Sequence, residues 1–175
     1  MIEAKNKLNL FLYKYTPIFL LFASILNEID FNNLGLKYFS FNFSYILIFY
    51  YSLRRSESLG YTYIFIAGLF NDVMIGVPMG TSSLSYFLIC GFTAYLRNIT
   101  LRPNLIKDWI FFLITILFLN FISFIVLMLI FKYEVSYFDQ LVNITFTFLL
   151  YLIFSYLFNL YDNFLLGKSN ARWKF

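Results

Sequence analysis

The chain has 175 residues, of which 61% are hydrophobic and only 13% are charged, and its formal net charge is +4. Soluble domains average roughly 25% charged residues, so a water-soluble globule of this size could not cover so much apolar surface. Soluble, disordered and fibrous classes are excluded, and we expect one domain over residues 1–175 with lipid as part of its solvent. The sequence has no His and one Cys, Cys90, which excludes His-ligated metal sites, Ser-His and Cys-His dyads and an intrachain disulfide.

Apolar stretches follow one another along the whole chain. A membrane-crossing helix needs about 20 mostly apolar residues, or about 17 at the short end. In the first stretch, Pro17 either kinks the helix or starts it after a short surface segment. The third and fourth stretches are short and are joined by residues 76–80, which predicts a tight helical hairpin. We predict an all-α membrane protein of about six spans, over residues 10–29, 36–53, 60–75, 81–96, 109–131 and 141–161.

Basic residues are distributed unevenly between the two sides that six spans create. If the N-terminus is cytoplasmic, 11 of the 13 Lys and Arg lie on the cytoplasmic side, and only Lys37 and Lys132 lie outside. Cytoplasmic loops of membrane proteins carry such an excess, so we predict that both termini are cytoplasmic. Five of these basic residues are topology determinants first, and secondarily candidate contacts for anionic lipid or a cytoplasmic protein. They are Arg54, Arg55, Arg97, Arg102 and Lys107.

Asp72 is the only acid well inside a predicted span. An ionised carboxylate is costly there, so it needs a partner or a special function. One interpretation is that Asp72 and Asn71 accept hydrogen bonds from free N–H groups of the turn at 76–80 or of the next helix. The other is ion or proton handling. We favour capping, because proton relays use several ionisable groups along a path.

The turn after Asp72 has the residues that a helical hairpin requires. Gly76 suits the left-handed position that ends a helix, Pro78 prevents continuation, and Gly80 lets the chain turn back. Thr81, Ser82 or Ser83 can then cap the next helix.

Small residues on the two helices of this hairpin predict a close packing seam between them. On the third stretch they are Ala67 and Gly68. On the fourth, one helical face carries Gly80, Ser83, Phe87, Gly91 and Ala94, all small except Phe87.

The remaining polar residues of the spans are sparse and mostly uncharged. They predict hydrogen bonds between helices, and contacts to a membrane partner would use the same groups. No paired carboxylates, no phosphate-binding loop and no Ser-Lys pair occur at a suitable spacing, so we predict no catalytic residue, no metal site and no cofactor. The polar sets that share a helical face are Asn120 with Ser123, Asn143 with Thr147, and Ser155 with Asn159 and Asp162.

The pattern Gly-x3-Asp-x3-Gly-x-Pro-x-Gly is formed by Gly68, Asp72, Gly76, Pro78 and Gly80. With the size, span number and orientation, it resembles MreD, the rod-shape-determining membrane protein family of bacteria. The resemblance implies a non-enzymatic scaffold of the elongasome in the bacterial inner membrane. Such a scaffold links an MreC-like periplasmic protein and MreB filaments to lateral peptidoglycan synthesis by a RodA-type glycosyltransferase and a class B penicillin-binding protein. It implies no nucleic-acid partner.

The family also resembles in fold the substrate-binding subunits of energy-coupling-factor transporters. This supplies an alternative function, a membrane subunit that binds a small nutrient such as a vitamin and needs a separate ATPase module. Such a subunit should have polar groups converging on an outer cavity. Few polar groups lie on the predicted outer side here, which favours the scaffold.

Overall fold

The computed structural model describes residues 2–26, with side chains from residue 11, and residues 41–99, 104–132 and 137–166. Every regular element within these ranges is helical, so the all-α prediction is confirmed for the described part of the chain. The elements are α1 (Ile2–Leu26), α2 (Phe43–Arg54), α3 (Tyr61–Ile75), α4 (Thr81–Ile99), α5 (Leu105–Ile125), the π-helical η2 (Val126–Ile130) and α6 (Tyr137–Leu166).

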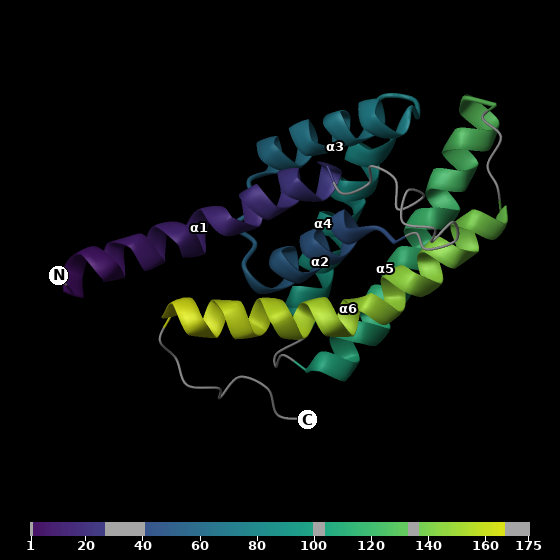
Figure 1. Cartoon of the computed structure of the whole chain (residues 1–175). Helices are drawn as coiled ribbons and strands as arrows, with labels where there is room; N and C mark the ends of the chain where they lie inside the picture. Colours follow the sequence, from purple (N-terminus) through teal and green to yellow (C-terminus); the bar gives the residue numbers. More distant parts are fainter. Residues whose placement is uncertain (1, 27–40, 100–103, 133–136, 167–175) are drawn as a thin grey trace, which may run out of the picture.

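α2 is the central helix of the bundle and packs against α1, α4 and α6 (Figure 1). A helix that is apolar on all sides is typically a buried one, and most of α2 is enclosed by its neighbours. Asn42 caps its first turn, since the side chain accepts a hydrogen bond from the Tyr45 backbone N–H. The buried residues of α2 are Ser44, Ile46, Leu47, Ile48, Phe49, Tyr50, Tyr51 and Ser52.

The helix boundaries differ from the predicted spans in several places. α1 runs through Pro17, so the interpretation that Pro17 starts the first helix is wrong. α2 has 12 residues, about 18 Å at 1.5 Å per residue, which is shorter than the span predicted over 36–53. Residues 36–40 of that span lie outside the described residues. Hydropathy alone cannot predict that α2 is a shorter, enclosed helix, because side chains packed against protein are as apolar as those packed against lipid.

Within the described ranges, two segments are long and apolar enough to cross a membrane: α5 with η2, over Leu105–Ile130, and α6, over Tyr137–Leu165. Only 17% and 22% of their most apolar segments are buried. A core helix of a soluble protein would be mostly buried, whereas here large apolar side chains face outward. Examples are Phe118, Phe121, Leu129, Leu149 and Ile153.

Polar side chains connect the helices at some of the positions where the sequence predicted such contacts, although the Ser155 hydroxyl has no hydrogen-bond partner on another helix among the described residues. Ser123 of α5 hydrogen-bonds Ser85 of α4, with 3.1 Å between the two Oγ atoms. The Gln140 Nε2 of α6 donates to the Asn120 Oδ1 of α5 at 3.2 Å. The predicted interhelical hydrogen bonds of Asn120 and Ser123 are therefore confirmed.

Candidate functional site

Two glycines shape the turn between α3 and α4. Gly76 ends α3 with φ 76° and ψ 27°, the left-handed conformation predicted for it. Its N–H and that of Val77 both donate to the Asp72 carbonyl, at 3.0 and 3.1 Å. Gly80 has φ 99°, a conformation that L side chains rarely adopt, and Thr81 starts α4 directly after it. Pro78 stands between them, and its carbonyl oxygen accepts from the Thr81 hydroxyl at 3.0 Å.

The Asp72 carboxylate is completely buried and lies at the start of α4. Its Oδ2 accepts from the Gly80 N–H at 2.6 Å. Its Oδ1 accepts from the Ser82 N–H at 2.8 Å and from the Thr81 hydroxyl at 2.9 Å. The first N–H groups of a helix have no partner within the helix, and its positive end favours an anion. These contacts agree with the capping interpretation.

Asn71, next to Asp72 in α3, also reaches α4. The residue is 1% exposed, and its Nδ2 donates to the Ser82 hydroxyl oxygen at 3.0 Å. The prediction that Asn71 accepts from free N–H groups is wrong, because its Oδ1 has no hydrogen-bond partner among the described residues. Two consecutive residues at the end of α3 thus bind the first turn of the next helix. The hairpin is held by side chains as well as by its backbone.

α3 and α4 approach each other most tightly at Gly68. A Cβ on Gly68 would lie 2.5 Å from the Ser83 Cα and 2.6 Å from its backbone nitrogen, far inside normal contact. The Ser83 hydroxyl donates to the Phe65 carbonyl at 3.1 Å and joins the two helices at the same level. The predicted seam of small residues is confirmed here.

Farther from the turn, the predicted seam is wrong. Gly91 is exposed, and no described atom lies within 4 Å of where its Cβ would stand. On this exposed side of the hairpin the two helices contact each other through aromatic rings, since Phe87 lies 6.1 Å from Phe65 and 6.4 Å from Tyr61, centroid to centroid. At Gly80 the added Cβ would also meet no described atom within 4 Å, so this glycine is needed for its backbone conformation and not for space.

A second polar site lies at the opposite end of α3, where α2 ends. The Arg54 Nη2 pairs with the Asp108 Oδ2 of α5 at 2.7 Å, and the Arg55 Nη1 pairs with the Asp162 Oδ1 of α6 at 3.1 Å. The arginine side chains are only 16% and 14% exposed. Arg54 and Arg55, which the sequence offered as topology determinants and as candidate cytoplasmic contacts, thus both bind acids of the same chain.

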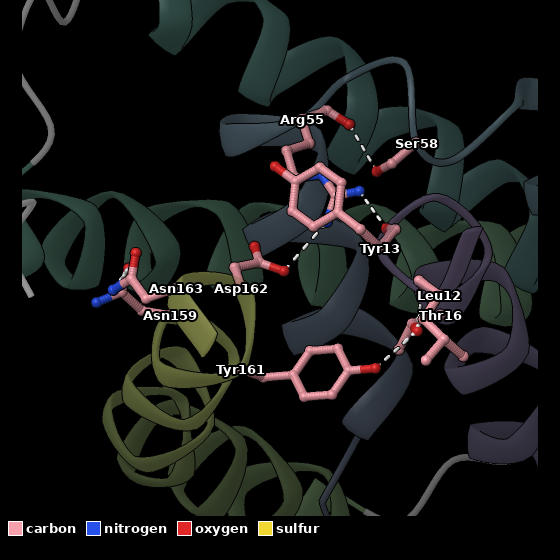
Figure 2. A network of polar contacts seen from close by, with 9 residues as sticks. All are labelled: Leu12, Tyr13, Thr16, Arg55, Ser58, Asn159, Tyr161, Asp162 and Asn163. Atoms are coloured by element: carbon pink, nitrogen blue, oxygen red, sulfur yellow. Dashed lines mark hydrogen bonds and ion pairs between the residues drawn. The ribbon is translucent and has the colours of Figure 1, made fainter. Parts of the chain in front are cut away.

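Arg55 makes further contacts with α1, as Figure 2 shows. Its Nη2 donates to the Tyr13 carbonyl, and its guanidinium lies 3.4 Å from the centroid of the Tyr13 ring. Nearby, the Tyr161 and Thr16 hydroxyls lie 3.0 Å apart and join α6 to α1. The face of α6 predicted to be polar therefore carries an interhelical contact through Asp162.

The other predicted basic contacts behave differently. Arg97, in the last turn of α4, and Lys107, in the first turn of α5, are exposed. Arg102 lies outside the described residues. Arg97 and Lys107 remain accessible to anionic lipid or to a cytoplasmic protein.

The sequence analysis did not identify Asp108 and Asp162 as partners of the arginines. One signal was available, because six spans place these two acids on the same side of the membrane as Arg54 and Arg55, each near a helix end. Opposite charges that share one membrane face are candidates for pairing.

Comparisons with protein-family models, with curated proteins and with solved structures find no match for this chain. The two sites must therefore be interpreted from their own geometry. Both join the ends of helices. One orders the α3–α4 turn through the buried Asp72 carboxylate, and the other joins α2 to α5 and α6 through ion pairs and to α1 through the Tyr13 carbonyl and ring.

Proposed function

We propose that this chain is a multi-pass protein of the bacterial inner membrane and a non-enzymatic, MreD-like scaffold of the elongasome. It would maintain rod shape by linking MreB filaments and an MreC-like protein to lateral peptidoglycan synthesis. The observation that carries the proposal is the α3–α4 turn, where each residue of the MreD-like pattern has a separate place in one unit. Gly68 allows the close approach, Asp72 binds the helix start, and Gly76, Pro78 and Gly80 form the turn.

The membrane location is supported by the surfaces of α5 and α6, whose apolar side chains face outward over lengths that can cross a bilayer. Six spans are supported by the contacts of the arginine site. Six spans with cytoplasmic ends would bring Tyr13, Arg54, Asp108 and Asp162 to one face of the membrane, and these residues do meet at one end of the bundle.

The topology can be tested with single cysteines on a Cys90→Ala background. We expect an impermeant maleimide, added outside intact cells, to label Asn32→Cys and not Ser169→Cys, because six spans place position 32 outside and position 169 inside. Permeabilised cells, in which both positions should react, are the control. Labelling of Ser169→Cys but not of Asn32→Cys in intact cells would contradict the topology.

Depletion in a rod-shaped host tests the function. We expect depleted cells to become round or swollen, and MreB and MreC to disperse from their normal sites, because the scaffold that joins them is lost. Light microscopy with labelled MreB and MreC is the measurement. Depleted cells that keep their shape, and whose growth is restored by a vitamin, would favour the transporter subunit instead.

A further inference from the structure

We propose that the two arginines at the end of α2 form an internal clamp that fixes the register of the α5–α6 hairpin against the rest of the bundle. This arginine clamp consists of Arg54, Arg55, Asp108 and Asp162. Arg54 is the last residue of α2, and Arg55 is its non-helical C-cap with φ −149° and ψ 65°, so the two side chains diverge. Arg54 reaches α5, while Arg55 reaches α6. Each helix of the hairpin is therefore held by its own ion pair.

At the clamp end of α2, the other contacts of the hairpin with this helix are mainly aromatic, and a hydrogen bond from the Asn42 N–H to the Thr147 hydroxyl at 2.8 Å joins α6 to the opposite end of α2. Phe49 of α2 packs on Phe112 of α5 and Tyr151 of α6, at 5.0 and 5.7 Å between ring centroids, and Tyr51 lies 5.4 Å from Phe158. Apolar contacts have little directionality, and lipid gives helices no hydrophobic reason to prefer one another. If α5 or α6 slides by one turn against α2, one aromatic ring can take the place of another. A partly buried ion pair, in contrast, forms in one register only.

Arg55 also distinguishes the clamp from a simple topology determinant. It pairs with Asp162, donates to the Tyr13 carbonyl and stacks on the Tyr13 ring, and so joins α6 to α1. A lysine has the same charge and would serve the topology equally well. It has a single ammonium group without a planar fork, so it cannot make all three contacts.

The register of the hairpin can be measured far from the clamp. Ser123 lies on α5, 15 residues beyond Asp108 and thus about 22 Å along the helix. Its Oγ is 3.1 Å from the Ser85 Oγ of α4, close enough for two cysteines at these positions to form a disulfide. Ser24 of α1 and Ser44 of α2, whose Oγ atoms are 2.7 Å apart, provide a matched disulfide that does not involve the hairpin.

The experiment uses the full chain with Cys90→Ala and one cysteine pair at a time, oxidised in native membranes. The variant Asp108→Asn with Asp162→Asn breaks both ion pairs without changing any basic residue, so the topology signal is preserved. We expect the disulfide between Ser85→Cys and Ser123→Cys to fall about fivefold or more, as expected for lost coupling between paired groups. We expect the yield of the disulfide between Ser24→Cys and Ser44→Cys to stay unchanged. If the hairpin shifts by one turn, Ser85→Cys should instead form a disulfide with Leu119→Cys or Leu127→Cys.

Two further variants keep the test decisive. Glu57→Gln neutralises an exposed acid close to Arg55 in sequence, and it should leave every disulfide unchanged. Arg55→Lys keeps the charge and should still lower the yield of the disulfide between Ser85→Cys and Ser123→Cys. This variant replaces the double Asn variant in the test if the latter does not accumulate. An unchanged yield in either clamp variant, in protein of normal abundance, would overturn the proposal. So would an equal fall of the Ser24→Cys to Ser44→Cys disulfide, because it would indicate general unfolding.

Discussion

Replacing Asp72 by Leu is expected to destabilise the α3–α4 hairpin by about 2–6 kcal/mol, because it removes the acceptor of two backbone N–H groups at about 1–3 kcal/mol each. These are the N–H groups of Gly80 and Ser82, which the carboxylate now accepts at 2.6 and 2.8 Å. The Thr81 hydroxyl loses less, since it can donate to the Pro78 carbonyl at 3.0 Å. Neither water nor lipid can replace the lost acceptor at a completely buried position.

Asp72→Asn is the matched variant, because it removes the charge and keeps one acceptor oxygen. That oxygen can still bind Ser82 and Thr81, while the amide nitrogen would face the Gly80 N–H. We therefore expect a loss of only about 1–2 kcal/mol and near-normal complex formation. Membrane abundance, thermal stability in detergent and co-purification of the proposed MreC-like partner are the measurements. If Asn impairs partner binding as severely as Leu while abundance is normal, the charge itself matters, and Asp72 handles a partner, an ion or a proton.

Replacing Gly68 by Ala should separate α3 from α4 and cost about 3 kcal/mol, the upper range for overpacking a well-packed interior. The new Cβ would lie 2.5 Å from the Ser83 Cα, and a backbone atom cannot rotate away as the end of a side chain could. The contacts of the turn would be strained as well, since Ser82 and Ser83 both belong to the first turn of α4. Thermal unfolding of the purified chain in detergent measures the effect.

Gly91→Ala in α4 is the control for this substitution. The position is exposed, and an added Cβ would meet no described atom within 4 Å, so the variant should be neutral or more stable by up to about 1 kcal/mol. Equal stability of Gly68→Ala and Gly91→Ala would show that the close approach at Gly68 is not a constraint on the fold.

The turn could be predicted because its determinants are local. Asp72, Gly76 and Gly80 are spaced four residues apart, and the left-handed conformation at Gly76 follows from the preference of helix ends for glycine. The seam could be predicted only near the turn. The sequence shows the same kind of small residue at Gly91, and only the path of the helices decides that this position is exposed and has no close neighbour among the described residues.

The arginine clamp could not be predicted as a set of pairs. Arg54 and Asp108 are 54 residues apart in sequence, and Arg55 and Asp162 are 107 apart. The six predicted spans would bring all four to one face of the membrane, but which acid meets which arginine depends on how α5 and α6 pack. The central position of α2 could not be predicted either, because hydropathy does not distinguish a helix surrounded by protein from one surrounded by lipid.

Affinity purification from native membranes in mild detergent, followed by mass spectrometry, tests the proposed scaffold most directly. The tagged full chain should bring down an MreC-like periplasmic protein together with a RodA-type glycosyltransferase and a class B penicillin-binding protein. Gly68→Ala and Asp72→Leu should lose these partners in proportion to their loss of abundance. Recovery of a transporter ATPase pair in place of the wall-synthesis proteins would contradict the account.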